Sequence, residues 1–373
     1  MAEQCILYGV PFSLYTGKAR SYLIKQGIPY RELVPKTEHY LNDVLPAVHR
    51  LMMPTLELPN NEYIQDSTVI IEYFENQPGI TSALPETPKQ KMIALLFDVM
   101  GSEGLLRPAM HYRWNFKEDN DDFLEQCFST MIPSGIDDPL SQAKKGMDRM
   151  RRAAVNFGAK PDSISVIESA YEELLDLLDA HFLKMPYLLG GRPSIGDFGL
   201  IAPFYAHLSR DPYPSMMMKK RALRVFRWTE RMNRSNQDAG EYSNCPEAFL
   251  ADDEIPETLK AVIKLLSEDF VPETLAAAAC INQWLEKTNP EDGTPVKRGV
   301  GLGEFEFRGI KIQALAQPYR FFLLTRMQKA FAGLNESGKE VVRTVFDELG
   351  LTPLLSVKIN RAVMRHDHLE VWR

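Results

Sequence analysis

One stretch near the start of the chain, a short apolar strand that runs into a helix, constrains the fold more than any other. The strand is predicted at Cys5–Tyr8, and the helix opens within Pro11–Leu23, whose sequence is PFSLYTGKARSYL. Ser13 lies at the turn between them, where helix N–H groups without partners and the positive end of the helix dipole gather. A hydroxyl at this place can donate to an anion, and it lowers the pKa of a thiol whose thiolate it contacts. The alternative is that Ser13 only caps the helix.

The next segments predict the remainder of a small α/β unit. Met53-Pro54 precedes the alternating residues Leu56–Leu58, and a proline at the start of a strand marks an edge strand or a cis turn because it has no N–H to donate. We expect the Met53–Pro54 peptide bond to be cis. A turn at Pro59–Asn61 leads into a return strand at Glu62–Gln65. Asp66-Ser67 then caps a further helix.

These pieces resemble the N-terminal domain of cytosolic glutathione transferases, which has a thioredoxin-like fold. The pattern SxYxxKxR resembles the active-site motif of the serine-type classes and is formed by Ser13, Tyr15, Lys18 and Arg20. Met53-Pro54 resembles the family's cis-proline and the residue before it. Asp66-Ser67, just after Gln65, resembles the family's Glu-Ser pair. The three pieces occur in the family's order and spacing, so together they are more specific than any one of them.

The resemblance implies a role for each of these residues, with glutathione as the co-substrate. Ser13 would donate a hydrogen bond to the glutathione sulfur and act as the catalytic residue. The backbone of Met53, next to Pro54, would pair with the cysteinyl part of the tripeptide. Ser67 and the helix start behind it would bind the γ-glutamyl carboxylate, and Asp66 would meet the γ-glutamyl ammonium group.

The position that often holds the glycine carboxylate departs from the family pattern. A basic residue frequently stands just before the cis-proline segment in the family, whereas this chain has Met52 there. The basic residues that can replace it are His39, His49 and Arg50, and solvent exposure is the alternative for each.

The resemblance also implies a pocket for an electrophilic substrate. We expect Tyr15, Tyr112 and Trp114 to line it. Core packing between helices is the alternative for the aromatic cluster around Tyr112 and Trp114.

Composition limits the classes of protein and partner. The chain has 373 residues, 45% of them apolar and 25% charged, as in a soluble globular protein of two or three domains. A net charge of −7 argues against general nucleic-acid binding, and no run is long enough to span a bilayer. The start, MAEQCILYGVPF, lacks the basic and apolar regions of a signal peptide. We therefore expect a cytoplasmic protein without nucleic-acid or membrane partners.

The cysteines and two short motifs argue against disulfide exchange, phosphate binding and metal binding. The four cysteines form neither a CxxC nor a zinc pattern, which predicts reduced thiols: Cys5, Cys127, Cys245 and Cys280. Ser13–Thr16 stands where a thioredoxin has CxxC, so this turn cannot exchange disulfides. The glycines at 299, 301 and 303 precede a strand, which makes a poor phosphate loop. No third ligand accompanies His366-Asp367-His368, so we expect a surface tail and no metal.

Three parts follow one another along the chain. We predict an α/β thioredoxin-like, glutathione-binding domain at 1–79 and an all-α domain at 88–235. An α+β extension with a β-hairpin is predicted at 236–373, packed on the helical domain.

Within the helical domain we predict a polar surface turn at Lys117–Asp122 and two capping boxes. One box is formed by Ser165 and Glu168 and the other by Ser194 and Asp197. The second resembles the buried capping box of the glutathione transferase C-terminal domain, where its role is structural.

The extension has its own elements. Two amphipathic helices are predicted at Pro256–Glu268 and Pro272–Lys287, and a hairpin with one apolar face around Arg308-Gly309. Further helices are predicted at Pro318–Ala332 and Ser337–Leu349. We expect the extension to close the electrophile pocket, and a stabilising cover on the outer face of the helical domain is the alternative.

The leading hypothesis is an enzyme that activates the glutathione thiolate for attack on a hydrophobic electrophile. One alternative keeps the site and changes the reaction to isomerisation, reductive dehalogenation or ether cleavage. Another is a non-catalytic binding or scaffold protein of the same fold. By analogy with the family we also expect a homodimer.

Overall fold

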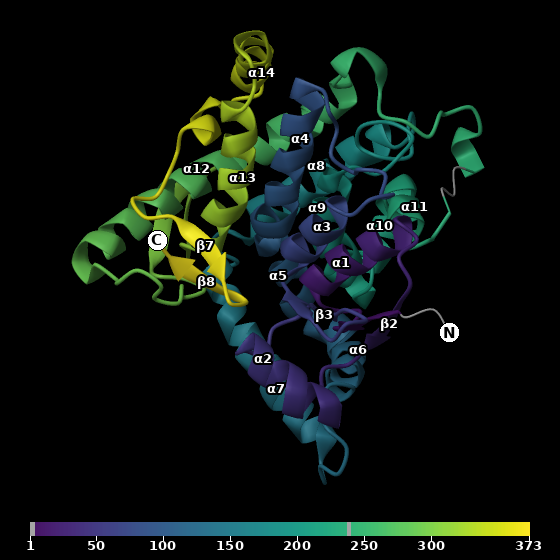
Figure 1. The fold of residues 1–373 in the computed structure, drawn as a ribbon, viewed down its shortest axis with the longest axis vertical. Helices are drawn as coiled ribbons and strands as arrows, with labels where there is room; N and C mark the ends of the chain where they lie inside the picture. The colour runs from purple at the N-terminus through teal and green to yellow at the C-terminus, as the bar shows by residue number, and fades with distance from the viewer. Residues whose placement is uncertain (1–3, 237–239) are drawn as a thin grey trace.

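The N-terminal part of the computed structural model is an α/β unit of the thioredoxin type (Figure 1). The structure describes residues 4–236 and 240–373. The elements of this unit are β1 (Cys5–Tyr8), α1 (Leu14–Lys25), β2 (Tyr30–Leu33), η1 (Tyr40–Val44), α2 (Leu45–Val48), β3 (Thr55–Glu57), β4 (Tyr63–Gln65) and α3 (Ser67–Glu75). The sheet has the strand order β2-β1-β3-β4, with β2 parallel to β1 and the other neighbours antiparallel. The predicted strand and helix at the start, and the later strand, return strand and helix, are therefore confirmed in that order.

Pro54 precedes an interior strand of this sheet, since β3 lies between β1 and β4. The Met53–Pro54 peptide bond is cis, as the sequence predicted.

A helical body follows, formed by α4 (Pro88–Val99), η2 (Met100–Gly104), α5 (Leu106–Trp114), α6 (Lys117–Ser129), α7 (Pro139–Ala154), η3 (Val155–Phe157), α8 (Ile164–His181), α9 (Ile195–Pro203), η4 (Phe204–Leu208), α10 (Pro212–Arg221) and α11 (Leu223–Arg231). Helix α9 is central because it packs on both α1 and α4. Gly199 permits this approach: a Cβ there would lie 2.4 Å from the Cα of Asp98.

Two local predictions in this body are wrong. Lys117–Asp122 is the first part of α6 and not a surface turn. The predicted box of Ser165 and Glu168 does not form because α8 begins one residue earlier, at Ile164. Glu168 instead places a carboxylate oxygen 2.9 Å from His111 Nε2. Tertiary contacts across helices thus outweighed the local capping pattern.

The second capping box is confirmed at the start of α9. Asp197 Oδ2 accepts hydrogen bonds from the backbone N and the hydroxyl of Ser194, both at 2.8 Å. Its other oxygen accepts from Leu188 N at 3.0 Å and from Trp228 Nε1 at 3.3 Å. This carboxylate therefore satisfies buried donors from three segments, which is a structural role.

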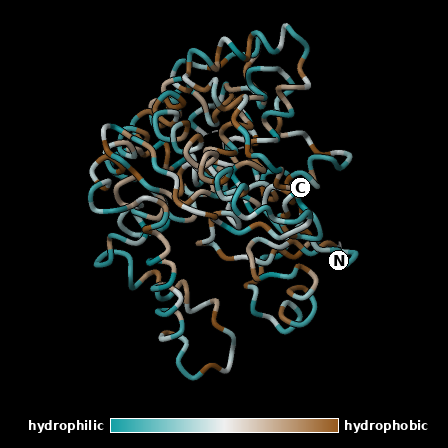
Figure 2. Tube along the Cα trace, turned by 90° about the vertical axis from the view of Figure 1, so that its left-hand side faces the viewer, coloured by the Kyte–Doolittle hydropathy of each residue, from teal (hydrophilic) through white to brown (hydrophobic). Residues whose placement is uncertain are grey.

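The extension consists of η5 (Gly240–Tyr242), η6 (Ala251–Asp253), α12 (Glu257–Thr288), β5 (Leu302–Phe307), β6 (Ile310–Leu315), α13 (Tyr319–Ala332), α14 (Glu336–Glu348), η7 (Thr352–Leu355), β7 (Val363–His366) and β8 (Leu369–Trp372). Helix α12 packs on α8, while α13 and α14 pack on α4 (Figure 1). Figure 2 shows hydrophobic and hydrophilic residues mixed along the chain, and a helix with one face of each kind buries its apolar face. One apolar core includes Leu7, Leu95 and Leu323, so it spans all three parts.

The two helices predicted around Pro272 are one continuous helix, α12. An interior proline removes one helical hydrogen bond and normally kinks or ends a helix. Buried residues lie on both sides of it, among them Phe270, Val271 and Thr274. Tertiary packing of α12 against α8 and β5 offsets the lost bond.

The predicted hairpin is confirmed by β5 and β6. Arg308 and Gly309 have φ angles of 48° and 78°, as a two-residue turn of type I′ requires. The buried face consists of Phe305, Phe307, Ile312 and Ala314.

A second hairpin, β7–β8, was not predicted. His366-Asp367-His368 lies at its turn rather than in a surface tail. Trp372 of β8 is fully buried and stacks on Trp284 of α12, with ring centroids 5.7 Å apart. Within residues 4–236 and 240–373, no group of three or more His, Cys, Asp or Glu side chains is arranged to hold a metal. In the same ranges no helix is long and apolar enough to cross a membrane.

Candidate functional site

The three sequence motifs meet at one end of the four-stranded sheet. Tyr8 at the end of β1 pairs with Thr55 at the start of β3, and Thr55 pairs with Gln65 at the end of β4. The segments that carry Ser13, Met53-Pro54 and Asp66-Ser67 all leave the sheet at this end. Asp66 N also donates to Pro54 O at 3.1 Å. Residues far apart in the sequence are therefore brought together by strand pairing.

Ser13 is the N-cap residue of α1. Its backbone is extended, with φ −96° and ψ 125°, and its hydroxyl oxygen accepts from Thr16 N at a long 3.4 Å. The side chain is only partly buried. Because capping uses the oxygen as an acceptor, the hydroxyl proton stays free to be donated to an anion in front of the helix.

Ser67 stands at the first position of α3, and its side chain is 1% exposed. Its hydroxyl has no hydrogen-bond partner within the described ranges. Buried polar groups nearly always have a partner, so this hydroxyl is suited to a ligand. Asp66, the N-cap residue, uses Oδ1 to accept from Thr68 N at 2.8 Å and Val69 N at 3.2 Å.

Lys18 and Arg20, the basic residues of the first motif, have structural partners. Lys18 Nζ lies 2.5 Å from Asp98 Oδ1 and donates to the hydroxyl of Thr68 at 2.9 Å. Burial raises the pKa of Asp98, but Lys18 and Arg326 outweigh it and hold that pKa below its usual value. Arg20 forms a two-bond fork with Glu32. Lys18 thereby fixes α1 against α3.

Tyr15 has a partner that sequence reasoning missed. Its hydroxyl donates to Glu103 Oε1 at 2.8 Å. Glu103 comes from η2 and is 2% exposed. Its second oxygen has no hydrogen-bond partner among the described residues. Burial raises the pKa of Glu103 to about 7, although Tyr15 and the nearby cations Arg320 and Arg298 lower it. A lone glutamate in an apolar helix gives no sequence signal for such a contact.

Tyr112 and Trp114 do not join Tyr15, and the electrophile-pocket role predicted for them is replaced by core packing. Tyr112 is fully buried, and its ring lies 4.7 Å from that of Tyr171 and 5.5 Å from that of Phe116. Trp114 is 3% exposed and belongs to a separate cluster with Phe12, Phe128 and others. The two side chains of α5 face different neighbours because they are two residues apart on a helix.

The three basic residues considered for the glycine carboxylate already have acidic partners. His39 contacts Asp43 at 2.8 Å and Glu57 at 3.0 Å. His49 contacts Asp367 at 2.8 Å. Arg50 contacts Glu370 at 2.6 Å and donates to Gln65 at 3.1 Å. Asp367 and Glu370 belong to the β7–β8 hairpin, so the extension reaches this part of the site.

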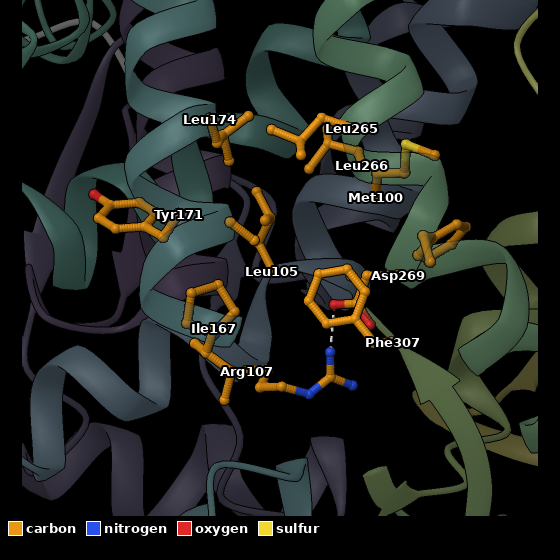
Figure 3. A pocket seen from close by; sticks show the side chains of 14 residues that line it. Met100, Leu105, Arg107, Ile167, Tyr171, Leu174, Leu265, Leu266, Asp269 and Phe307 are labelled. Atoms are coloured by element: carbon orange, nitrogen blue, oxygen red, sulfur yellow. Dashed lines mark hydrogen bonds and ion pairs between the residues drawn. The ribbon is translucent and has the colours of Figure 1, made fainter. Parts of the chain in front are cut away.

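A cavity of about 40 Å³ lies between α5, α8 and α12 (Figure 3). Apolar side chains such as Leu105, Ile167 and Leu265 line it, and the ion pair of Arg107 with Asp269 closes one side. Leu106, the first residue of α5, belongs to a separate apolar cluster with Leu14, the residue after Ser13. The cavity therefore lies behind α5 and has room for only a few water molecules.

The N-terminal domain matches the model of a known protein family. Residues 7–84 match the family model described as "Glutathione S-transferase, N-terminal domain". This domain belongs to the glutathione transferase superfamily. The resemblance of the sequence to that superfamily is thus confirmed. No curated protein matches the chain.

Solved glutathione transferases are similar at low identity. A glutathione transferase from Phanerochaete chrysosporium is 15% identical with a TM-score of 0.44, covering 63% of this chain and 98% of its own. The β-etherase LigF from Sphingobium is 18% identical with a TM-score of 0.41, covering 64% of this chain and 98% of its own. Rice glutathione transferase GST1, solved with glutathione, is 16% identical with a TM-score of 0.32, covering 64% of this chain and 91% of its own. At these values the matches say nothing about substrate.

Proposed function

We propose that this protein binds glutathione in its N-terminal domain and activates the thiol for attack on a hydrophobic electrophile. The observation that carries the proposal is the buried hydroxyl of Ser67, without a partner in the described ranges, at the start of α3 and at the same sheet end as Ser13. A buried donor at a helix N-terminus is suited to a carboxylate. The family match of residues 7–84 supports the same ligand.

Each proposed contact follows from the position of the residue. Ser67, through its hydroxyl and its backbone N–H at the start of α3, binds the γ-glutamyl carboxylate, and the Asp66 carboxylate meets the ammonium group. The Met53 backbone, next to Pro54, pairs with the cysteinyl unit. Ser13 donates its free hydroxyl proton to the sulfur. Each pKa unit by which a thiol is acidified corresponds to about 1.4 kcal/mol of preference for thiolate.

The electrophile then lies in front of α1, beside Tyr15. The Tyr15 hydroxyl is tied to Glu103, so its ring is held in one orientation as a wall of the pocket. By donating a hydrogen bond to the sulfur, Ser13 favours loss of the thiol proton of glutathione to solvent. The glutathione thiolate then forms the new bond to the electrophilic carbon as the bond from that carbon to its leaving group breaks. The same arrangement serves isomerisation or ether cleavage, since both begin with thiolate attack.

A non-catalytic binding or scaffold protein of the same fold is the second candidate. The observation that favours it is the pairing of Arg50 and His49 with Glu370 and Asp367, which occupies cations otherwise available to the glycine carboxylate.

Calorimetric titration of the full chain with glutathione tests the binding claim. The expected result is one site per chain. The Ser67→Ala variant is expected to bind more weakly, and Ser165→Ala, which alters an exposed serine of α8, is its matched control. Absence of binding by the wild type contradicts the proposal.

A panel of electrophiles then separates the two candidates. Turnover above the uncatalysed rate supports the enzyme, and binding of glutathione without turnover supports the non-catalytic protein.

A further inference from the structure

We propose that the C-terminal extension forms part of the glutathione site, with Tyr319 and Arg365 as positioning residues for the segment Gln65–Ser67. This inference rests on the proposed function and adds residues to it that lie far away in the sequence. Their effect is to hold the γ-glutamyl-binding segment in its binding geometry.

Tyr319 of α13 fixes the Asp66 side chain. Its hydroxyl donates to Asp66 Oδ2 at 2.8 Å, across 253 residues of sequence. Asp66 Oδ1 is the cap of α3. The carboxylate is thus held at both oxygens, which sets the direction from which an ammonium group can approach it.

The backbone of Asp66 gives a reason for this support. Its φ is 96°, a conformation that costs free energy in a residue with a side chain and persists only when surrounding contacts hold it. The hydrogen bond from Tyr319 and the cap of α3 are those contacts. Without the hydroxyl of Tyr319, the segment is expected to sample other conformations.

Arg365 of β7 holds the neighbouring residue. Its guanidinium donates to both the backbone O and the side-chain Oε1 of Gln65, each at 2.7 Å, across 300 residues of sequence. Arg50 donates to the same Oε1 at 3.1 Å. Glu370 pairs with both arginines. Gln65 is 2% exposed, so its two polar groups depend on these donors.

The net charge of the side chains around Gln65 favours an extension that helps to bind glutathione over one that blocks the site. Arg50 and Arg365 carry two positive charges and Glu370 carries one negative charge, which leaves the cluster cationic. This single surplus positive charge favours an anionic group, the γ-glutamyl carboxylate, at the neighbouring start of α3. A lid that competes with glutathione for this site would present a surplus of acidic groups instead.

Four variants of the full-length chain test the inference by calorimetric titration with glutathione. Tyr319→Phe removes one hydroxyl, and Arg365→Met removes the fork on Gln65. Tyr213→Phe, on a ring stacked on Phe116 in the helical body, and Arg343→Met, on the exposed face of α14, are the matched controls.

We expect each test variant to weaken glutathione binding by roughly ten-fold, since a hydrogen bond to a charged group is lost, and each control to keep the wild-type Kd. With an electrophile, KM for glutathione should rise by the same factor while kcat changes by less than about two-fold. Arg365→Lys, which retains the charge, should recover part of the affinity.

Wild-type affinity in both test variants overturns the inference while leaving the proposed function intact. Tighter binding in either variant also overturns it, because that result identifies the extension as an obstructing lid. If the wild-type chain does not bind glutathione, the proposed function fails and this inference fails with it. Thermal unfolding of every variant separates a loss of fold from a loss of affinity.

Discussion

At Ser67, a buried hydroxyl without a hydrogen-bond partner among the described residues distinguishes the start of α3 from an ordinary helix start. The neighbouring Asp66 caps α3, so Ser67 is not needed for capping. We predict that Ser67→Ala raises the Kd for glutathione by roughly ten-fold or more, with little loss of fold stability because the hydroxyl has no partner within the described residues. Calorimetry and urea unfolding measure the two effects. A large loss of stability with unchanged affinity would assign the hydroxyl to the core.

The burial of Glu103 makes the stability of the fold depend on pH. Its pKa is about 7 in the fold and 4.5 in its ordinary state, because burial disfavours the charged form. The folded chain therefore binds the proton more tightly than the unfolded chain. Its contribution to stability is full below pH 4.5 and is lost as the pH rises through 7.

We predict that between about pH 4.5 and pH 8 the wild type loses on the order of 3 kcal/mol more unfolding free energy than Glu103→Gln, which has no carboxyl to ionise. Urea unfolding at several pH values measures the difference. Parallel pH profiles for the two proteins would show that Glu103 has an ordinary pKa.

Among the elements, those with local signals were predictable. The hairpin β5–β6 followed from alternation around Arg308-Gly309, and the α9 start followed from Ser194 and Asp197. Glu168 satisfied the same local pattern, yet its partner is His111 on another helix. Capping motifs are short, so a tertiary partner that the sequence does not reveal can override them.

The proline inside helix α12 leads to a prediction about the stability of a single element. Pro272 interrupts its hydrogen bonding without ending it. We predict that Pro272→Ala raises the unfolding free energy by about 1–3 kcal/mol, because it restores a helical N–H and removes a ring that clashes with the preceding turn. Urea unfolding measures the change. Ala278→Pro, at a buried position of the same helix, should be strongly destabilising. A loss of stability in Pro272→Ala would mean that the packing of α12 on α8 requires the proline.

For the whole molecule, the sequence predicted the order of strands and helices in the thioredoxin-like unit and the motif residues Ser13, Met53-Pro54 and Asp66-Ser67. It did not identify Glu103, Tyr319 or Arg365. The motif residues are linked by short connections and strand pairing, which leave local patterns. The missed residues contact the site through folding of segments 88–300 residues away, and no local pattern records such contacts. The domain boundaries and the homodimer stay predictions.

The shared core predicts how the extension behaves when removed. Helices α12 and α13 cover α8 and α4, and Ile263 and Leu323 are almost completely buried. A chain ending at Gly240 exposes this apolar surface, so we predict that it does not unfold cooperatively and aggregates under conditions in which the full chain is soluble. Urea unfolding and sedimentation measure both. A soluble, cooperatively folded truncation would show that the extension is an independent unit.

The state of the glutathione thiol tests the central claim most directly. The ultraviolet absorbance of the thiolate is followed while the pH of the full-length protein with bound glutathione is raised. An ordinary cysteine thiol has a pKa of about 8.5, and we predict that the bound thiol titrates about two units lower in the wild type. In Ser13→Ala it should return toward the free value, with turnover reduced roughly ten- to a hundred-fold and the Kd little changed. A bound thiol that titrates like free glutathione in the wild type would contradict the account.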